Sequence, residues 1–240
     1  MFLAAFPTGA FEANCYVLAT GPDAECVVVD PGEGAFATVD EICSDNGLTP
    51  VAVCATHGHL DHIADAARVC EHWQVPCWIH PADQQLLTEP LAGLPAQWRP
   101  AVEELIGGTT LPAPARVEPY GHSLALAGLE FEVTHAPGHS PGSVVLRVSP
   151  TDPATDTPDR DAGDHAQPPT TVVLSGDVIF AGSIGRTDLP GGDLDTMTRT
   201  LTRLMAALPP DAVLLPGHGP RTTMAAELAS NPYLPRAGTG

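Results

Sequence analysis

The chain has 240 residues, of which 43% are hydrophobic, and its formal net charge at pH 7 is −19. This length and hydrophobic content allow a full hydrophobic core and exclude global disorder, while the acidic balance argues against a protein that tracks nucleic-acid phosphates. No residue is lysine, which excludes Schiff-base chemistry.

Several features indicate a cytoplasmic protein. The apolar start of the chain lacks the basic leader and the long apolar core of a signal peptide. No run approaches the ~20 apolar residues of a membrane span. The six cysteines form no Cys-x-x-Cys pair and several lie in apolar runs, so we expect buried free thiols and not a disulfide framework.

The first third of the chain alternates strand-like and helix-like segments. In chain order, the sequence predicts strands at 14–19 and 26–29, a helix at 36–45 and a buried strand at 51–55. Asp30 ends the second of these strands, and we expect its carboxylate to hold a neighbouring loop by hydrogen bonds.

Directly after the buried strand stands the heptapeptide Thr-His-Gly-His-Leu-Asp-His, residues 56–62. Its side chains His57, His59, Asp61 and His62 can converge on one point at the end of a strand. Imidazole nitrogen and carboxylate oxygen are ligands that zinc and iron accept readily. Solvated loop histidines are the alternative, but the clustering with an aspartate favours a metal site.

The middle of the chain carries shorter elements. Asp61 is predicted to cap a helix that runs through Trp73. A strand at 77–79, a helix at 81–87 and a short helix at 100–106 in a proline-rich stretch are expected to follow. We interpret the Trp and Phe side chains as core residues.

The second half repeats the alternation of strands and helices. The expected elements are strands at 124–126, 129–134, 143–148, 171–174 and 212–215, with a helix at 194–208. This order suggests two sheets packed face to face with helices outside. Residues 149–170 are rich in Pro and Asp and predict a flexible acidic loop between neighbouring strands.

Three further segments supply possible metal ligands. His139 lies in a predicted turn between strands, Asp177 follows a strand, and His218 follows the final predicted strand. Each has a glycine immediately before it, which allows close approach of the backbone. Each segment is weak alone, since such residues are ordinary in turns. Together with the heptapeptide they form a specific pattern.

This pattern, His-x-His-x-Asp-His followed by His, Asp and His, resembles the metallo-β-lactamase superfamily over roughly residues 1–235. The resemblance implies an α/β fold, a four-layer αβ/βα sandwich of two mixed β-sheets flanked by helices, as one domain over 1–240. It also implies two divalent metal ions, with zinc preferred and iron or manganese as alternatives. The ligands it implies are His57, His59 and His139 for one ion, Asp61, His62 and His218 for the other, and Asp177 between them.

The run Gly-Arg-Thr-Asp-Leu-Pro-Gly-Gly at 185–192 resembles small, single-domain glyoxalase II-like proteins. It implies hydrolysis of a small-molecule thioester by a metal-bridging hydroxide that Asp61 orients. Arg186 and Asp188 stand where two-domain glyoxalase II carries a Lys and a Tyr that contact glutathione. Arg186 is therefore either a substrate contact or part of a structural salt bridge. The chain leaves no room for the C-terminal helical domain of those relatives, so the carrier thiol stays open among glutathione, mycothiol and bacillithiol.

A second enzyme class resembles the same pattern. Persulfide dioxygenases bind one non-haem iron through two His and one Asp, here His57, His139 and Asp177. A β-lactamase, a nuclease and a non-enzymatic binding module fit less well, because the chain is acidic, shows no leader and has all seven ligand positions filled. We expect no nucleic-acid or membrane partner, and the sequence leaves the oligomeric state open.

Overall fold

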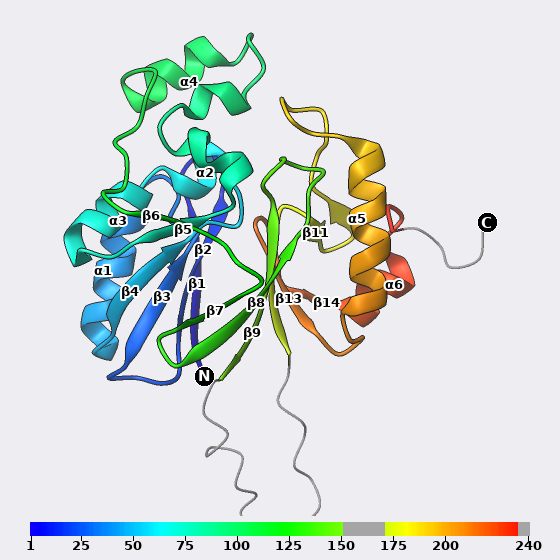
Figure 1. The fold of residues 1–240 in the computed structure, drawn as a ribbon, viewed down its shortest axis with the longest axis horizontal. Helices are drawn as coiled ribbons and strands as arrows, with labels where there is room; N and C mark the ends of the chain where they lie inside the picture. Colours follow the sequence, from blue (N-terminus) through cyan, green and yellow to red (C-terminus); the bar gives the residue numbers. More distant parts are fainter. Residues whose placement is uncertain (151–170, 235–240) are drawn as a thin grey trace, which may run out of the picture.

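The computed structural model describes residues 1–150 and 171–234. Within these residues two six-stranded sheets lie face to face, and helices cover both outer faces (Figure 1). The predicted four-layer αβ/βα sandwich is therefore confirmed. From residue 151 onward the predicted acidic loop lies outside the described residues, whereas Ser149 and Pro150 still belong to a strand.

The first sheet comes from the N-terminal half, and its strands lie in chain order. Neighbouring strands pair antiparallel from the first strand to the third and parallel from the third to the sixth, so the sheet is mixed. Its strands are β1 (Phe2–Thr8), β2 (Ala13–Ala19), β3 (Glu25–Val29), β4 (Thr49–Cys54), β5 (Cys77–Ile79) and β6 (Val117–Pro119). The sequence predicted neither edge strand, because each pairs on one side only and carries a proline.

The second sheet has the order β14-β13-β10-β9-β8-β7, with β10 and β13 parallel. Its bounds are β7 (Ser123–Leu126), β8 (Leu129–His135), β9 (Val144–Pro150), β10 (Val172–Gly176), β13 (Val213–Pro216) and β14 (Thr222–Thr223). A small hairpin of β11 (Ile179–Phe180) and β12 (Ser183–Ile184) follows β10. These two strands and β14 are two residues long each, too short for a periodic pattern.

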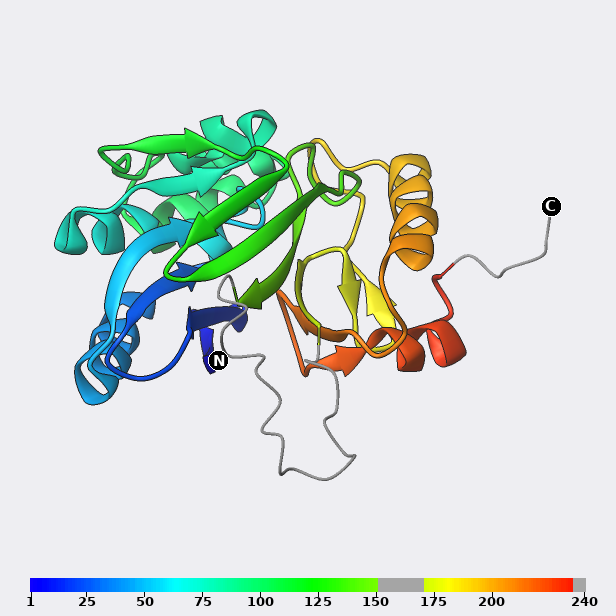
Figure 2. The same cartoon turned by 60° about the horizontal axis from the view of Figure 1, so that its bottom comes forward.

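Helices cover each sheet on its outer side, as both views of the ribbon show (Figures 1 and 2). The first sheet carries α1 (Ala35–Asn46) and α3 (Ala66–Trp73), and the second carries α5 (Leu194–Ala207) and α6 (Met224–Ser230). Near one end of the sheets lie α2 (Leu60–Ile63), the 3₁₀ helices η1 (Pro81–Leu87) and η2 (Pro90–Gly93), and α4 (Arg99–Ile106).

The long helix predicted from Asp61 to Trp73 is wrong. The chain forms two helices with a break at residues 64 and 65, and His59, not Asp61, is the N-cap of the first. At the break, the amide of Asp65 donates to the carbonyl of Pro31, and its carboxylate accepts from the amide of Phe36 at 2.9 Å. These contacts end α2 and leave the Asp61 side chain in its first turn.

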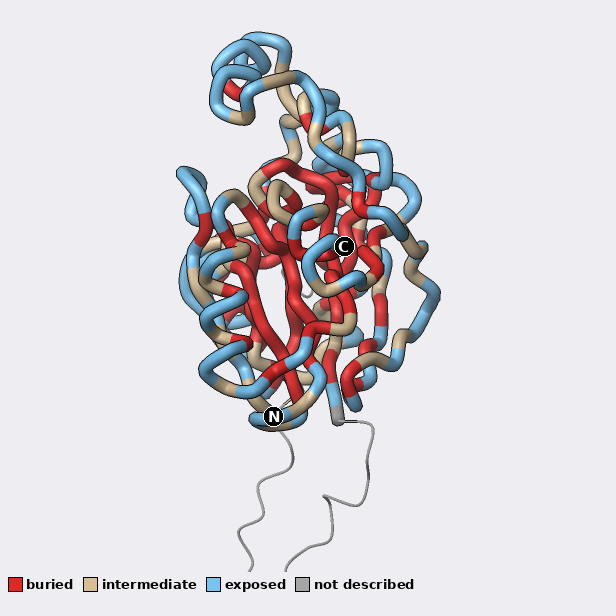
Figure 3. The backbone as a smooth tube through the Cα atoms, turned by 90° about the vertical axis from the view of Figure 1, so that its left-hand side faces the viewer, coloured by how far each residue is buried: buried red, intermediate tan, exposed pale blue. Residues whose placement is uncertain are grey.

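The strands bury residues on both faces, because each sheet lies between helices and the other sheet. On β3, Val27 and Val29 pack into the cluster between the sheets, whereas Cys26 and Val28 face the helices. Figure 3 shows that the buried residues gather in the interior, whereas exposed residues lie mostly on the outer segments. All six cysteines are free and buried, as predicted. In the described part of the chain, no helix has the length and apolar character needed to cross a membrane.

Candidate metal centre

Four separate segments meet where strands of both sheets end. The heptapeptide follows β4, Asp177 follows β10, His218 lies two residues beyond β13, and His139 lies in the turn between β8 and β9. Two backbone hydrogen bonds join the sheets here. The amide of Val144 donates to the carbonyl of Thr56, and the amide of Asn14 donates to the carbonyl of Gly217. The packing of the two sheets therefore brings the segments together.

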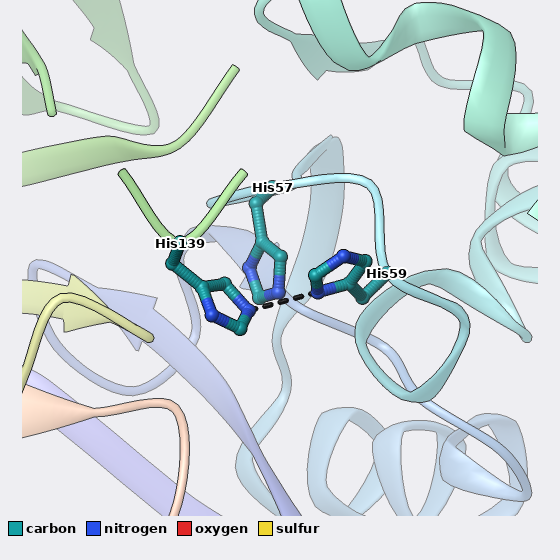
Figure 4. A group of neighbouring side chains, drawn as sticks. All are labelled: His57, His59 and His139. Carbon is teal, nitrogen blue, oxygen red and sulfur yellow. Dashed lines mark hydrogen bonds between the residues drawn. The ribbon is translucent and has the colours of Figure 1, made fainter. Parts of the chain in front are cut away.

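The first group of side chains is His57, His59 and His139 (Figure 4). All three are buried, and one nitrogen from each lies within 4.8 Å of the others. Nδ1 of His59 and Nε2 of His139 are 2.8 Å apart. Three buried imidazoles thus point at one small volume.

The second group is Asp61, His62 and His218, and Asp177 lies between the two groups. Nε2 of His218 is 3.2 Å from Oδ2 of Asp61. The carboxylate of Asp177 is 3.5 Å from Nε2 of His62 and 3.4 Å from Nε2 of His139. All seven predicted ligands therefore converge, although their roles as ligands stay a prediction.

The spacing of these atoms suits a divalent metal. A tetrahedral zinc with bonds of about 2.0–2.1 Å holds its ligand atoms about 3.3 Å apart. Contacts of 3.2 to 3.6 Å recur across the second group and Asp177. Nε2 of His57 and Oδ1 of Asp177 are two of the five buried side-chain N and O atoms that make no hydrogen bond within the described residues. Buried polar atoms are almost always partnered, so these two atoms fit ligands of a cation.

Hydrogen bonds on the far side of three rings set which nitrogen faces the centre. Nδ1 of His62 donates to Asp30, Nδ1 of His139 to the carbonyl of Arg186, and Nδ1 of His218 to the carbonyl of Phe11. Because a neutral imidazole has one N–H, each of these rings presents an Nε2 lone pair toward the others once it is neutral. Such outer partners commonly orient histidine ligands of metals.

The two groups differ in charge. Burial lowers the pKa of His57, and it lowers the pKa values of His59 and His139 to about 4. These three rings are neutral at pH 7, the form that binds a metal.

The carboxylates have the opposite effect on the second group. Burial by itself would lower the pKa of His62, but Asp61, Asp177 and Asp30 raise it to about 10. Burial likewise opposes the increase in the pKa of His218 that Asp61 and Asp177 cause. In the metal-free protein, protons on these rings therefore balance carboxylates that a metal cation would otherwise balance.

Zinc binding to the metal-free protein is expected to release about one to two protons at pH 7.5, because a ligating histidine must be neutral. His62, whose pKa is raised to about 10, holds one of those protons. The raised pKa of His218 makes that ring the source of a second. The apparent affinity should therefore rise with pH. Titration calorimetry in two buffers of different ionisation enthalpy measures the release, and a buffer-independent heat would contradict the assignment.

Asp30 braces the histidine loop, as predicted. Its carboxylate accepts hydrogen bonds from the amide and hydroxyl of Thr56, both at 2.7 Å, and from Nδ1 of His62 at 3.1 Å. It is fully buried and adopts a left-handed backbone conformation with φ of 51°. Asp30 thus joins the end of β3 to the start of the heptapeptide and to the candidate ligand His62.

Asp83, in η1, is a bracing residue that sequence reasoning missed. Its buried carboxylate accepts from the amide of Gly58 at 2.9 Å, from the hydroxyl of Ser140 at 2.6 Å and from the amide of Gly142 at 2.7 Å. It therefore ties the heptapeptide to the turn that carries His139. In the sequence, an aspartate two residues after a proline reads only as the first turn of a helix.

Replacing Asp83 by asparagine is expected to lower zinc affinity about tenfold without unfolding the protein. The amide keeps the shape but cannot accept all three hydrogen bonds. Competition with a chromophoric chelator measures the affinity, and Asp45→Asn, at an exposed position on α1, is the matched control. Unchanged affinity in Asp83→Asn would show that the two loops hold their places without it.

Glycine allows close packing around Asp177. A Cβ atom at Gly217 would overlap Oδ1 of Asp177, and one at Gly185 would overlap its carbonyl oxygen. The glycine that precedes His218 thus makes room for the carboxylate of Asp177, which is the close backbone approach expected from the sequence.

A cavity of about 640 Å³ opens beside the centre. Ligand-binding clefts commonly measure ≈300–1,000 Å³ and are lined mainly by apolar side chains. Phe11 and Trp98, which we expected in the core, are 55% and 39% exposed and line this cavity. Five of the candidate ligands also line it: His59, Asp61, His139, Asp177 and His218.

Arg186 also lines the cavity, and it forms the salt bridge that was one of its two expected roles. Its Nε and Nη2 donate to the two carboxylate oxygens of Asp188 at 2.6 and 2.7 Å. Its guanidinium carbon lies 4.9 Å from the ring centre of Trp98. A contact of Arg186 with substrate stays a prediction.

The sequence profile of the metallo-beta-lactamase superfamily matches residues 8–152. The chain belongs to this superfamily. An uncharacterized protein of Mycobacterium tuberculosis is 40% identical over 237 residues, covering 98% of each chain. Hydroxyacylglutathione hydrolase GloC of Haemophilus influenzae is 30% identical and covers 95% of each chain.

Solved structures of the superfamily share the fold. The B3 metallo-beta-lactamase BLEG-1 is 32% identical, with a TM-score of 0.77 over the full length of both chains. TTHA1623, in a di-iron-bound form, is 33% identical, with a TM-score of 0.71 over 96% of this chain and 100% of that one. ETHE1 from Myxococcus xanthus is 21% identical, with a TM-score of 0.69 over 97% of this chain and 84% of its own, and shows the fold alone. The chain thus stands among metal-dependent hydrolases of this fold, and its His and Asp cluster suggests a divalent metal site.

Proposed function

We propose that this protein hydrolyses thioesters of a low-molecular-weight thiol with the help of two divalent metal ions. The observation that carries the proposal is the convergence of seven His and Asp side chains beside a cavity that can hold a small molecule. The 30% identity with hydroxyacylglutathione hydrolase GloC over nearly the whole chain supports the reaction type. We expect no nucleic-acid or membrane partner.

Two ions would divide the seven side chains between them. His57, His59 and His139 would hold one, Asp61, His62 and His218 the other, and Asp177 would contact both. When bound, such ions supply Lewis acidity and make water acidic enough to act as a nucleophile near neutral pH. Zinc is the preferred metal, with iron and manganese as alternatives, because all three accept imidazole and carboxylate ligands.

The chain's own residues would position the reactants. Asp61 lines the cavity. Burial alone would raise the pKa of its carboxyl, but in the metal-free protein His62 and His218 hold that pKa well below the usual range, and a bound cation would act in the same direction. Its carboxylate therefore stays ionised and can accept the hydrogen bond of an attacking water. The departing thiolate has a conjugate acid of pKa ≈8.5 and needs little protonation, so the reaction requires no separate acid.

A second candidate function is the oxygen-dependent oxidation of a persulfide at a single iron. The proximity of two His and one Asp favours it. Potential ligand atoms of His57 and Asp177 lie within 4.8 Å of each other, and Nε2 of His139 lies 3.4 Å from Oδ2 of Asp177. This set is the facial triad of non-haem iron oxygenases.

Two assays on one preparation separate these functions. The first is elemental analysis of the purified protein, and the second compares turnover of a thioester panel, including S-D-lactoylglutathione, with turnover of glutathione persulfide. We expect two metal ions per chain and thioester cleavage without oxygen uptake. One iron per chain with oxygen consumption would replace the hydrolase by the dioxygenase.

A further inference from the structure

The cavity beside the metal centre offers little free charge to a substrate. Apart from the candidate ligands, Arg186 is the one charged residue among the described residues that line it, and Gln97 and Ser183 are the other polar ones. Arg99 lies next to Trp98 but does not line the cavity, and its Nε donates to the carbonyl of Leu94. A substrate arm in this cavity therefore meets few charged groups.

The positive charge of Arg186 is already compensated. Both carboxylate oxygens of Asp188 are held by its guanidinium group, and Asp188 is itself exposed to the solvent that a substrate would cross. A carboxylate that approached Arg186 would be repelled by Asp188 at nearly the same distance. The bidentate pair also fixes the guanidinium plane beside Trp98, where it supports an aromatic wall.

The remaining walls are apolar and partly open to water. Trp98, Leu94 and Val102 come from α4 and the turn before it, and Phe180 and Ile184 come from the β11–β12 hairpin. Phe11 completes the rim between β1 and β2. Because exposed aromatic surface gains free energy when it is covered, this lining favours an apolar occupant.

We propose that the part of the substrate that fills this cavity is uncharged and mainly apolar, and that Arg186 and Asp188 act together as a neutral wall. This inference rests on the proposed function, thioester hydrolysis, and adds the chemical class of the substrate. A neutral thiol carrier, or an apolar acyl group, matches the cavity. Glutathione, with two carboxylates and one ammonium group, matches it poorly.

The test measures binding and needs no turnover. Two unreactive thioethers with the same alkyl group, S-butyl-N-acetylcysteamine and S-butylglutathione, are titrated by calorimetry into the protein as purified with its metal. We expect the neutral compound to bind about tenfold more tightly. Trp98→Ala should weaken binding of the neutral compound about tenfold, since it removes an aromatic wall.

A second pair of variants isolates the charge. Asp188→Asn releases Arg186 and is expected to tighten binding of S-butylglutathione severalfold while leaving the neutral thioether unchanged. Asp195→Asn makes the same change in net charge at an exposed position on α5, away from the cavity, and should alter neither affinity. Equal tightening in both variants would attribute the effect to net charge and overturn the role of the Arg186–Asp188 pair.

The outcomes separate this inference from the proposed function. Tighter or equal binding of S-butylglutathione by the unmodified protein overturns the inference. Hydrolysis of a glutathione thioester in preference to its neutral counterpart overturns it too but keeps the hydrolase. Absence of turnover on every thioester rejects the hydrolase, whereas the affinity ranking still decides what the cavity selects.

Discussion

Replacing Asp61 by alanine is expected to lower kcat/KM for thioester hydrolysis about 10²–10⁴-fold, the range typical of a positioned proton-transfer group. The carboxylate lies 3.2 Å from Nε2 of His218 and 3.6 Å from Nε2 of His62. Its loss removes one proposed ligand and the proposed acceptor for the attacking water together. Steady-state kinetics with metal content measured on the same sample tests this expectation.

The protein should stay folded after this change. Asp61 lies in the first turn of the four-residue helix α2. Within residues 1–150 and 171–234, its carboxylate contacts the rings of His62 and His218 and accepts no hydrogen bond from a backbone amide. Asp61→Asn, which keeps the shape and removes the charge, should lose turnover as well. Asp40→Ala, at an exposed position on α1, removes the same group elsewhere and should leave turnover unchanged. Near-normal rates in both Asp61 variants would show that neither the second metal position nor this carboxylate is needed.

Replacing Asp30 by alanine is expected to cost about 3–5 kcal/mol of the free energy of unfolding. The change leaves the amide of Thr56 and Nδ1 of His62 buried without their acceptor. It also puts alanine at a φ of 51°, which aspartate and asparagine tolerate better than other residues with a side chain. For a chain of this size the midpoint of thermal unfolding should fall by roughly 10 °C.

Denaturation of the metal-free protein, followed by circular dichroism, measures the loss. Asp30→Asn is the matched variant, because it keeps the tolerated backbone conformation and one acceptor oxygen, and we expect it to lose clearly less stability than Asp30→Ala. In both variants zinc affinity should fall about 10–100-fold, since His62 loses the partner that orients its ring. A loss below about 1 kcal/mol in Asp30→Ala would mean that water or a neighbouring group replaces the carboxylate.

The longer elements of the fold could be read from the chain because they bury residues at regular spacing. On α5, the side chains of Met197, Leu201 and Leu204 are buried one helical turn apart, and the sequence shows that spacing directly. Strands β2 and β3 contain continuous apolar runs, residues 15–19 and 26–29, and these runs are buried between two layers. The two-residue strands β11, β12 and β14 carry no such pattern, since pairing with neighbours alone defines them.

The break between α2 and α3 shows why local pattern was not enough. The apolar residues on either side of it suit one continuous helix, but Asp65 binds the backbone at Pro31 and Phe36, which are about thirty positions away. Tertiary contacts of this kind override helix propensity. The same holds for Trp98 and Phe11, which apolar character assigns to the core and the fold places around a cavity.

The amino-acid sequence by itself determined the kinds of residue in the candidate metal centre, because His and Asp next to glycine at the ends of apolar runs are visible without a structure. It also determined the sandwich, since buried strands and amphipathic helices alternate along the chain. Only the tertiary structure decided that the two sheets bring four segments to one point, that Asp83 joins two of these segments, and that Arg186 forms a salt bridge with Asp188. These are contacts between side chains far apart in the chain or free to choose other partners, and spacing along a sequence does not specify them.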